Sequence, residues 1–476
     1  MTTTASKVKN GILILLILVI SNSGFAQVSI QKDGRHSSVT IEKNGLNSFK
    51  VDYRGKISIS DDDRDITAIS SGGHIEISKT AFGSKREVRI EGTSSGLTRE
   101  YYVGRQKVEW EPEGRKWLAE ILPEVVRSSG IGAESRVNRF YKQGGVSAVI
   151  EELQMINSDY VEAIYAGFLL DMDLSSSELV QALEGVSDEI DSDYYLANVL
   201  KDRSRKLLAK DEVATAYFKA VREIGSDYYA AAVLKEALED GDFSGEQVDA
   251  IIDAAREIGS DYYMASVFMD VMSNSKISDE VIIAILESTD DIESDHYQSQ
   301  VLKEVMHRDS ASPEVQKALL RVVGNVSSDH YMTEVFREML EKELDSDALA
   351  DLLRVVGDEM SSDHYAHIVL KEVVDSQGLT EMVIEQLSNA LDEMSSDHYA
   401  SQVLQEVARE DLTDDQMIKL MQAAADIDSD HYLTEVLLSF AGKVRNGSPK
   451  LKEAYREAAK SIDSDTYYGR AVKAID

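Results

Sequence analysis

The chain has 476 residues, with 50 Lys and Arg against 86 Asp and Glu, and its formal net charge is −36. It contains no Cys, which excludes disulfide frameworks and Cys-based metal or redox sites. So acidic a surface disfavours nucleic acid, because phosphates are bound by basic surfaces.

Residues 1–26 have the pattern of a secretory signal peptide. Lys7 and Lys9 precede an apolar run at 11–20, and Ala26 is a small residue directly before Gln27, where we place the cut. A retained membrane anchor is the alternative, but a helix of about ten residues rises only about 15 Å, roughly half the hydrocarbon thickness. We expect a periplasmic or secreted protein of a bacterial envelope, without a stable membrane span after cleavage.

Residues 27–113 predict a small antiparallel all-β domain, because apolar and polar residues alternate in short runs. The runs cover 28–30, 38–43, 49–53, 56–60, 74–78, 86–90 and 107–110. Turn pairs such as Asn44-Gly45 separate them, which favours hairpins and a two-layer sandwich. The acidic run at 61–65 lacks the Gly and Glu positions of an EF-hand calcium loop, so a solvated turn is favoured.

A Ser-Asp pair followed by aromatic residues recurs through the rest of the chain. The spacing between successive Asp residues is 34 seven times, then 33, then 35. The ten members are Asp159, Asp193, Asp227, Asp261, Asp295, Asp329, Asp363, Asp397, Asp430 and Asp465. Each period holds two amphipathic stretches, as at 226–259, where Val233 and Leu234 precede Ile251 and Ile252. Such two-helix hairpins bury their apolar stripes by stacking.

The predicted fold class is therefore α+β multidomain, with the all-β domain followed by a long α-solenoid of 34-residue two-helix repeats. We divide the chain into a signal peptide at 1–26, a β-strand domain at 27–113, a helical cap of the solenoid at 114–156 and solenoid repeats at 157–476. In the cap, Trp117, Leu118, Ile121 and Leu122 share one face. Residues 1–115 hold 17 basic and 14 acidic residues, which leaves 33 against 72 for residues 116–476, a net charge of −39.

The Ser of each Ser-Asp pair is predicted to cap the first helix of its repeat, and the repeated Asp is expected to be structural. A second series of Ser and Thr residues is predicted to cap the second helices, and Lys210 interrupts it. Its members are Ser176, Ser244, Ser278, Ser312, Ser346, Thr380, Thr413 and Ser448.

The array of Ser-Asp-Tyr/His-Tyr hairpins resembles HEAT-like helical repeats of bacterial proteins, including regions attached to membrane metallopeptidases of the antibiotic-sensor type. The period also equals that of a tetratricopeptide repeat, but the Trp, Leu-Gly and Pro signature of that repeat is absent. The resemblance implies a helical-repeat architecture and no peptidase activity, because the chain has no HExxH zinc motif.

Two aromatic columns follow the repeated Asp. The first includes His296, His330, His364, His398 and His431, which admit a metal-binding or pH-sensing stripe. Helices of adjacent repeats lie about 8–10 Å apart, which is too far for two His to share one ion, so a half-exposed position is favoured. The second column is Tyr in nine repeats and Val161 in the other. It admits stacking of bases or sugars, but packing between repeats is favoured.

An acidic ladder lies nine residues after the Asp. Its members, the candidate interaction surface, are Asp202, Glu236, Asp270, Glu304, Glu338, Glu372 and Glu406. A Lys or Arg often precedes them, which favours ion pairs between repeats, and a negative groove is the alternative.

The chain lacks a phosphate-binding Gly-rich loop, a nucleophile elbow and a Cys nucleophile. We therefore expect no enzymatic activity, no cofactor and no metal. The predicted function is that of an exported scaffold whose acidic solenoid surface binds a protein or peptide, with a basic partner as one option and no nucleic acid. The alternatives are an extracytoplasmic sensor or regulatory module that binds a ligand or cations, and a hydrolase with a site where the β region meets the helices.

Overall fold

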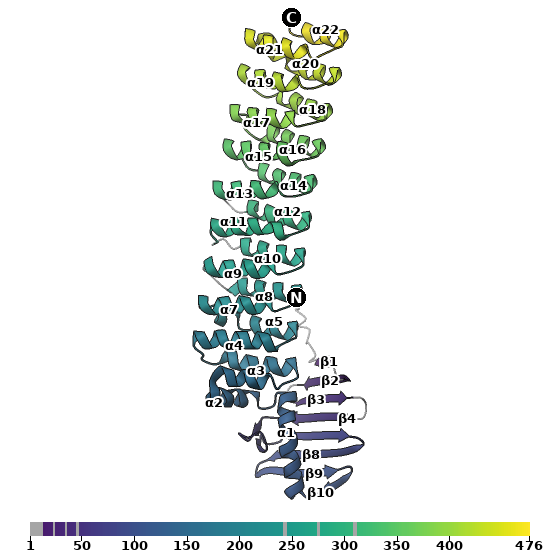
Figure 1. Cartoon of the computed structure of the whole chain (residues 1–476), viewed down its shortest axis with the longest axis vertical. Coiled ribbons are helices and arrows are strands. Elements are labelled where there is room, and N and C mark those ends of the chain that lie inside the picture. The colour runs from purple at the N-terminus through teal and green to yellow at the C-terminus, as the bar shows by residue number, and fades with distance from the viewer. Residues whose placement is uncertain are drawn as a thin grey trace, which may run out of the picture. The chain divides into compact units, whose positions relative to one another are not determined.

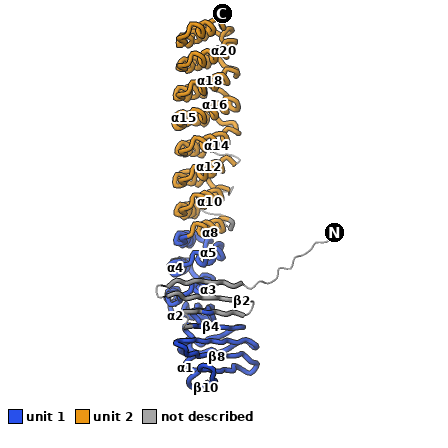
Figure 2. Tube along the Cα trace, turned by 90° about the vertical axis from the view of Figure 1, so that its right-hand side faces the viewer, with its two compact units in different colours: residues 1–225 blue, residues 226–476 orange. Residues whose placement is uncertain are grey.

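The structure is a computed structural model that describes the backbone of residues 13–21, 24–33, 36–43, 47–240, 245–273, 277–307 and 312–476. It divides into two units, residues 1–225 and 226–476 (Figure 2). Lys7, Lys9 and the predicted cap Ser244 lie outside the described residues. The apolar segment at 13–21 is a strand that pairs with residues 24–32.

The first unit contains an eight-stranded antiparallel sheet in the order β1-β2-β3-β4-β7-β8-β9-β10, with the hairpin β5–β6 beside it (Figure 1). The strands are β1 (Leu13–Ser21), β2 (Gly24–Asp33), β3 (His36–Lys43), β4 (Asn47–Arg54), β5 (Ile57–Ile59), β6 (Ile66–Ile69), β7 (His74–Ala81), β8 (Ser84–Thr93), β9 (Gly96–Val103) and β10 (Gln106–Val108). The expected antiparallel hairpins are confirmed. The expected sandwich is wrong, because the strands other than the β5–β6 hairpin form one sheet, in which β7 continues beside β4.

A helix supplies the second layer in place of another sheet. Helix α1 (Arg115–Ser129) follows a short turn at Trp110–Gly114. Its buried Leu118 and Leu122 belong to one core with Val51, Ile77 and Val88 of the sheet. The side chains assigned to the opening cap of the solenoid therefore pack against the strands. Alternation explains this, since every second residue of β4, β7 and β8 projects apolar atoms onto the same face.

Ten helices begin at the repeated Asp, and we call them the first helices. They are α3 (Asp159–Asp171), α5 (Asp193–Lys201), α8 (Asp227–Asp240), α10 (Asp261–Ser273), α12 (Asp295–Glu304), α14 (Asp329–Leu340), α16 (Asp363–Ser376), α18 (Asp397–Val407), α20 (Asp430–Asn446) and α22 (Asp465–Lys473).

The second helices are α4 (Ser176–Glu189), α7 (Asp211–Arg222), α9 (Gly245–Arg256), α11 (Asp279–Ser288), α13 (Pro313–Val323), α15 (Ser346–Glu359), α17 (Glu381–Asp392), α19 (Asp414–Ala424) and α21 (Pro449–Ala459). Helix α2 (Ala133–Leu153), which is kinked at Gly144 and Gly145, and the short helix α6 (Ser204–Leu207) lie outside this alternation.

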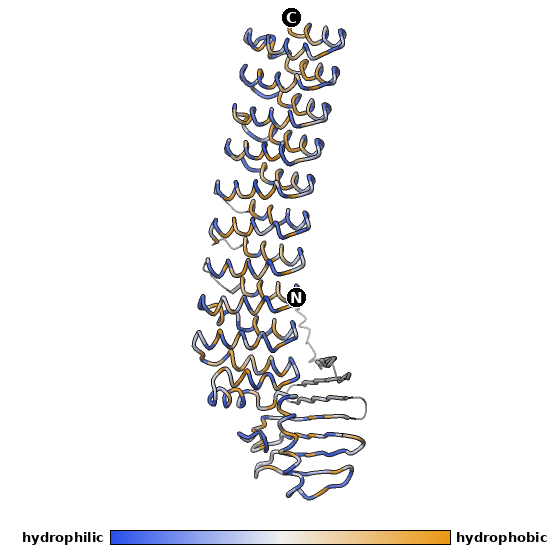
Figure 3. The backbone as a smooth tube through the Cα atoms, in the orientation of Figure 1, coloured by the Kyte–Doolittle hydropathy of each residue, from blue (hydrophilic) through white to orange (hydrophobic). Residues whose placement is uncertain are grey.

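Within the second unit, first helices pack on first helices and second helices on second helices, as α14 on α16 and α15 on α17 show (Figure 1). Along each helix, hydrophobic and hydrophilic residues alternate with the helical turn (Figure 3). The predicted core of residues 226–259 is confirmed, because Val233, Leu234, Ile251 and Ile252 are all buried. The fold is a β region followed by an α-solenoid.

Candidate binding surfaces of the helical repeats

The repeated Asp bind the backbone of the following repeat. From Asp193 to Asp430, each carboxylate accepts a hydrogen bond from a main-chain N–H that lies 32–34 residues further along, in the turn before the next first helix. The donor–acceptor pairs are Gly225 to Asp193 (2.9 Å), Gly259 to Asp227 (3.0 Å), Ser294 to Asp261 (2.9 Å), Ser327 to Asp295 (3.2 Å), Ser362 to Asp329 (2.7 Å), Ser395 to Asp363 (3.4 Å), Ser429 to Asp397 (2.8 Å) and Ser464 to Asp430 (3.0 Å). These bonds connect neighbouring hairpins through charged acceptors, which form the stronger class of hydrogen bond.

The Ser of the Ser-Asp pair does not cap its own helix through its side chain at most of the repeats where the cap is described. Ser429 is an exception, with its hydroxyl accepting from Tyr432 N. The prediction is wrong for seven positions: Ser158, Ser192, Ser294, Ser328, Ser362, Ser396 and Ser464. In several repeats the backbone N–H of this Ser serves the Asp of the preceding repeat instead.

The second helices are capped by side chains, largely as predicted. Ser312, Thr380, Thr413 and Ser448 each accept a hydrogen bond from the third residue of the helix. The predicted caps Ser176 and Ser346 are wrong by one residue, because Ser175 caps α4 and Asp345 caps α15. Ser278 precedes α11 without such a bond.

The aromatic side chains after the Asp form a ladder on the surface of the second unit. At each step, the exposed ring directly after one Asp contacts the half-buried Tyr of the next repeat, with ring centroids 5.4–6.1 Å apart. The pairs are Tyr228–Tyr263, Tyr262–Tyr297, His296–Tyr331, His330–Tyr365, His364–Tyr399, His398–Tyr432 and His431–Tyr467. In the first column, Tyr228 and Tyr262 are 56% and 54% exposed. The Tyr residues of the second column are half-buried, so this column packs between repeats and not in the core.

The His side chains of this ladder are held by neighbours on their own helices. Nε2 of His296 lies 3.1 Å from the amide of Gln300, and Nε2 of His330 lies 3.6 Å from the carboxylate of Glu334. Among the described residues, no group of three or more His, Asp or Glu is placed to hold a metal ion.

Most members of the acidic ladder have partners. Lys235 pairs with Asp270 at 2.9 Å, Arg337 with Glu372 at 3.7 Å and Lys371 with Glu406 at 3.5 Å. His307 lies 3.1 Å from Glu304 and 3.8 Å from Glu338, and Glu236 also has a partner. Asp202 alone among the seven forms no ion pair with a described residue. Most of the ladder thus has a partner within the chain, and three of its members pair with a Lys or Arg.

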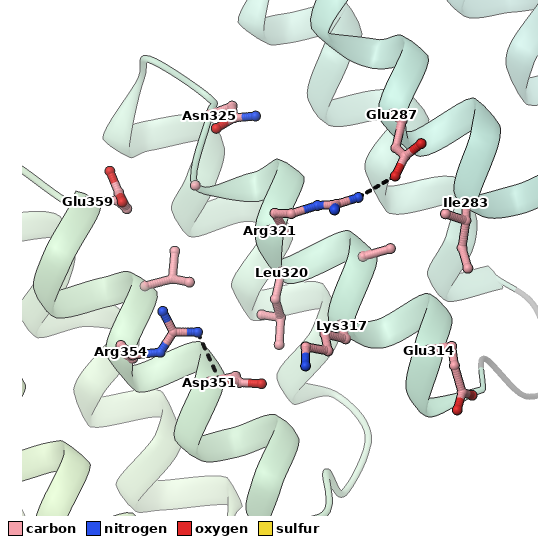
Figure 4. Close-up of a pocket in the computed structure, with 13 residues that line it drawn as sticks. Ile283, Glu287, Glu314, Lys317, Leu320, Arg321, Asn325, Asp351, Arg354 and Glu359 are labelled. Atoms are coloured by element: carbon pink, nitrogen blue, oxygen red, sulfur yellow. Dashed lines mark hydrogen bonds and ion pairs between the residues drawn. The ribbon is translucent and has the colours of Figure 1, made fainter.

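A pocket of about 580 Å³ opens on the second helices α11, α13 and α15 (Figure 4). Arg321 pairs with Glu287 at 2.5 Å, and Arg354 pairs with Asp351 at 3.0 Å. Lys317 also lines it. Because its lining carries both signs of charge and most cations are paired, the pocket favours no particular ligand charge.

In the first unit, the acidic run at 61–65 binds arginines. Asp63, with φ of 55°, contacts Arg136 and Arg139, whose Nη2 lies 2.8 Å from the Asp63 carboxylate. Arg136 is 1% exposed and also pairs with Glu152. Asp65 lies 3.2 Å from Arg115. The expectation of a solvated turn is therefore wrong for Asp63 and Asp65, which anchor the β5–β6 loop to helices.

Comparisons with known proteins add little. No protein-family profile and no curated protein matches the chain. Three known structures share helical repeats with it: a homology model of the full-length AP-3 complex (11% identity, 74% of this chain and 84% of that chain, TM-score 0.28), PUF-8 in complex with PBE-RNA (15%, 66% and 93%, 0.28) and a circular tandem repeat protein (12%, 76% and 91%, 0.16). At these TM-scores the likenesses carry no argument about function. None of them links the chain to sensor metallopeptidases.

Within the described ranges, no helix is both long and apolar enough to cross a membrane.

Proposed function

We propose that this chain is an exported, non-enzymatic scaffold whose helical repeats bind an extended basic segment of a partner protein. The ladder of exposed rings in the second unit carries this proposal. The faces of the Tyr rings attract cations, and carboxylates beside them would add a Coulombic attraction. A protein partner, and not a nucleic acid, follows from the sign of the charge.

The turns that lead into the ring positions supply those carboxylates. They contain the exposed residues Glu293, Glu393, Asp428 and Asp463. Within the described residues, Lys460 is the basic residue of these turns. A cationic segment laid along the rings would therefore meet carboxylates at successive repeats.

The repeat spacing sets the register of such a segment. An extended chain rises about 3.3 Å per residue, and packed helices lie about 8–10 Å apart. One repeat thus corresponds to about three residues of the partner, so a Lys or Arg at every third position would reach each ring in turn.

This proposal moves the interaction surface away from the predicted acidic ladder. That ladder lies two helical turns beyond the rings, and its charges are mostly engaged by Lys, Arg and His of the chain. Export rests on the leader pattern of residues 1–26, and cleavage before Gln27 would also remove β1. The narrower resemblance to repeats of sensor-type metallopeptidases remains a hypothesis about ancestry.

Peptide binding to the chain that starts at Gln27 tests the proposal. The probes are 21-residue Gly/Ser peptides with Arg at every third position, or with Glu at the same positions. The triple variant Tyr262→Ser, His330→Ser and His398→Ser should bind the Arg peptide at least tenfold more weakly. The control Met382→Ser with Asp415→Ser, on second helices, should bind normally. Equal affinity of the ring variant, or affinity for the Arg peptide that does not fall with NaCl, would contradict the proposal.

A further inference from the structure

A spacing rule links the cations of one first helix to the carboxylates of the next. In three cases a Lys or Arg pairs with the acidic residue 35 positions later: Lys235 with Asp270, Arg337 with Glu372 and Lys371 with Glu406. The rule follows from stacking, since residues one repeat apart occupy equivalent places on adjacent helices.

Asp202 lacks this partner because residue 167, 35 positions earlier, is Gly. Its side chain is exposed, and no described residue pairs with it. Arg203 follows it in sequence but is engaged elsewhere: its Nη2 donates to Asp171 at 2.9 Å, and its Nε lies 2.8 Å from the same carboxylate. The Asp202 carboxylate therefore has no cation among the described residues of this chain.

A groove of about 450 Å³ lies between α3 and α5. Gly167 is part of its wall, and the Arg203 guanidinium covers this glycine, with its Nη2 2.8 Å from where a Cβ would stand. Aromatic side chains form its walls: Tyr160 lies 6.0 Å from Tyr195, and Tyr194 lies 5.1 Å from Tyr195, measured between ring centroids. Phe168 stands where the later repeats carry the acidic ladder, and it is 36% exposed. Phe168 and Asp202 thus lie in one groove lined by rings.

A hydroxyl group in this groove is also without a partner. The Tyr195 hydroxyl oxygen is buried and makes no hydrogen bond to a described residue. Burial raises the pKa of Tyr195 to about 12. Like any phenol the hydroxyl is neutral near pH 7, and its oxygen can accept a hydrogen bond from an N–H donor. Asn198 supplies a further amide oxygen on the same wall.

We propose that the α3–α5 groove binds an arginine side chain of the partner, which supplies the cation that Gly167 does not. Charge supports this occupant, because Asp171 and Asp202 face one arginine of the chain and the groove holds one negative charge in excess. Shape supports it as well, since a planar guanidinium stacks on aromatic rings and donates in several directions. The inference deepens the proposed function, on which it rests, by naming a side chain and an anchor point outside the ring ladder.

The test measures binding of three capped tripeptides, acetyl-Gly-Arg-Gly-amide and its Lys and Phe counterparts, to the chain that starts at Gln27. Heteronuclear NMR titration reports both affinity and location. Asp202→Asn and Phe168→Ala should each weaken the Arg peptide at least fivefold. Gly167→Lys should abolish binding, because its side chain would push the Arg203 guanidinium aside, and two cations of the chain would then face Asp171 and Asp202. The matched control Asp270→Asn should bind as the wild type does.

Three outcomes would overturn the inference: Arg binding that is unchanged in Asp202→Asn and Gly167→Lys, Lys binding equal to Arg binding, or tighter binding of the Phe peptide. The triple variant Tyr262→Ser, His330→Ser and His398→Ser should still bind the Arg tripeptide in the groove. If the Arg tripeptide does not bind the groove while the 21-residue Arg peptide binds the ladder of rings, only this inference is contradicted. If the groove binds and the ladder does not, only the proposed function falls.

Discussion

Replacing Asp329 with Ala should weaken the contact between two neighbouring repeats of the second unit. Its carboxylate accepts from Ser361 N at 3.3 Å and from Ser362 N at 2.7 Å. A hydrogen bond to a charged group contributes roughly 1.5–3 kcal/mol. One of the two bonds is long and Asp329 is half-exposed, so we expect a loss of about 2 kcal/mol, which is about 30-fold in an opening equilibrium.

Hydrogen exchange measures this loss where it occurs. The amides of Ser361 and Ser362 should exchange about 30-fold faster in Asp329→Ala, whereas the amide of Ser395, which Asp363 binds, should change far less. Asp358→Ala removes an exposed carboxylate from the same acidic unit and controls for relief of charge repulsion. Wild-type protection at Ser361 and Ser362, or equal loss in the control, would refute the assigned role.

Three further predictions concern single side chains. Thr413→Ala should cost about 1 kcal/mol of stability and Ser396→Ala less than about 0.5 kcal/mol in urea denaturation, because only Thr413 caps its helix. Burial raises the pKa of Glu162 to about 8, so the stability of the protein should fall by about 4 kcal/mol or less as the pH rises from about 4.5 to 8. The variant Glu162→Gln should not show this fall. Asp63→Ala should cost about 3 kcal/mol, read from the tryptophan fluorescence of the first unit, because it leaves Arg136 buried with one carboxylate fewer.

The architecture could be predicted because its signals are local. A first helix begins at each of the ten repeated Asp, and apolar residues such as Val233 and Ile251 fill the core that their spacing indicates. The strands followed from alternation in the same way. Alternation did not predict that helix α1 forms the second layer of the β region. No local pattern distinguishes a helix that covers a sheet from one that begins a solenoid.

The binding surfaces were harder to predict because they depend on pairs of residues in different repeats. Composition identified an acidic solenoid, and the columns of Tyr, His and Asp/Glu were visible as columns. The sequence did not show which carboxylates are paired with a cation of the chain. The interval of 35 residues between Lys235 and Asp270 became a usable signal only once the pairing was known.

By itself, the sequence determined the 34-residue period, the two-helix hairpin and the start of each first helix, since these depend on residues within one or two turns of each other. The tertiary structure decided what the recurring polar groups do. Asp329 serves the turn at Ser361–Ser362 and not its own helix, and Asp202 is left unpaired beside four rings. Both outcomes arise because stacking brings residues 32–35 positions apart into contact, and that offset is set by how the hairpins pack.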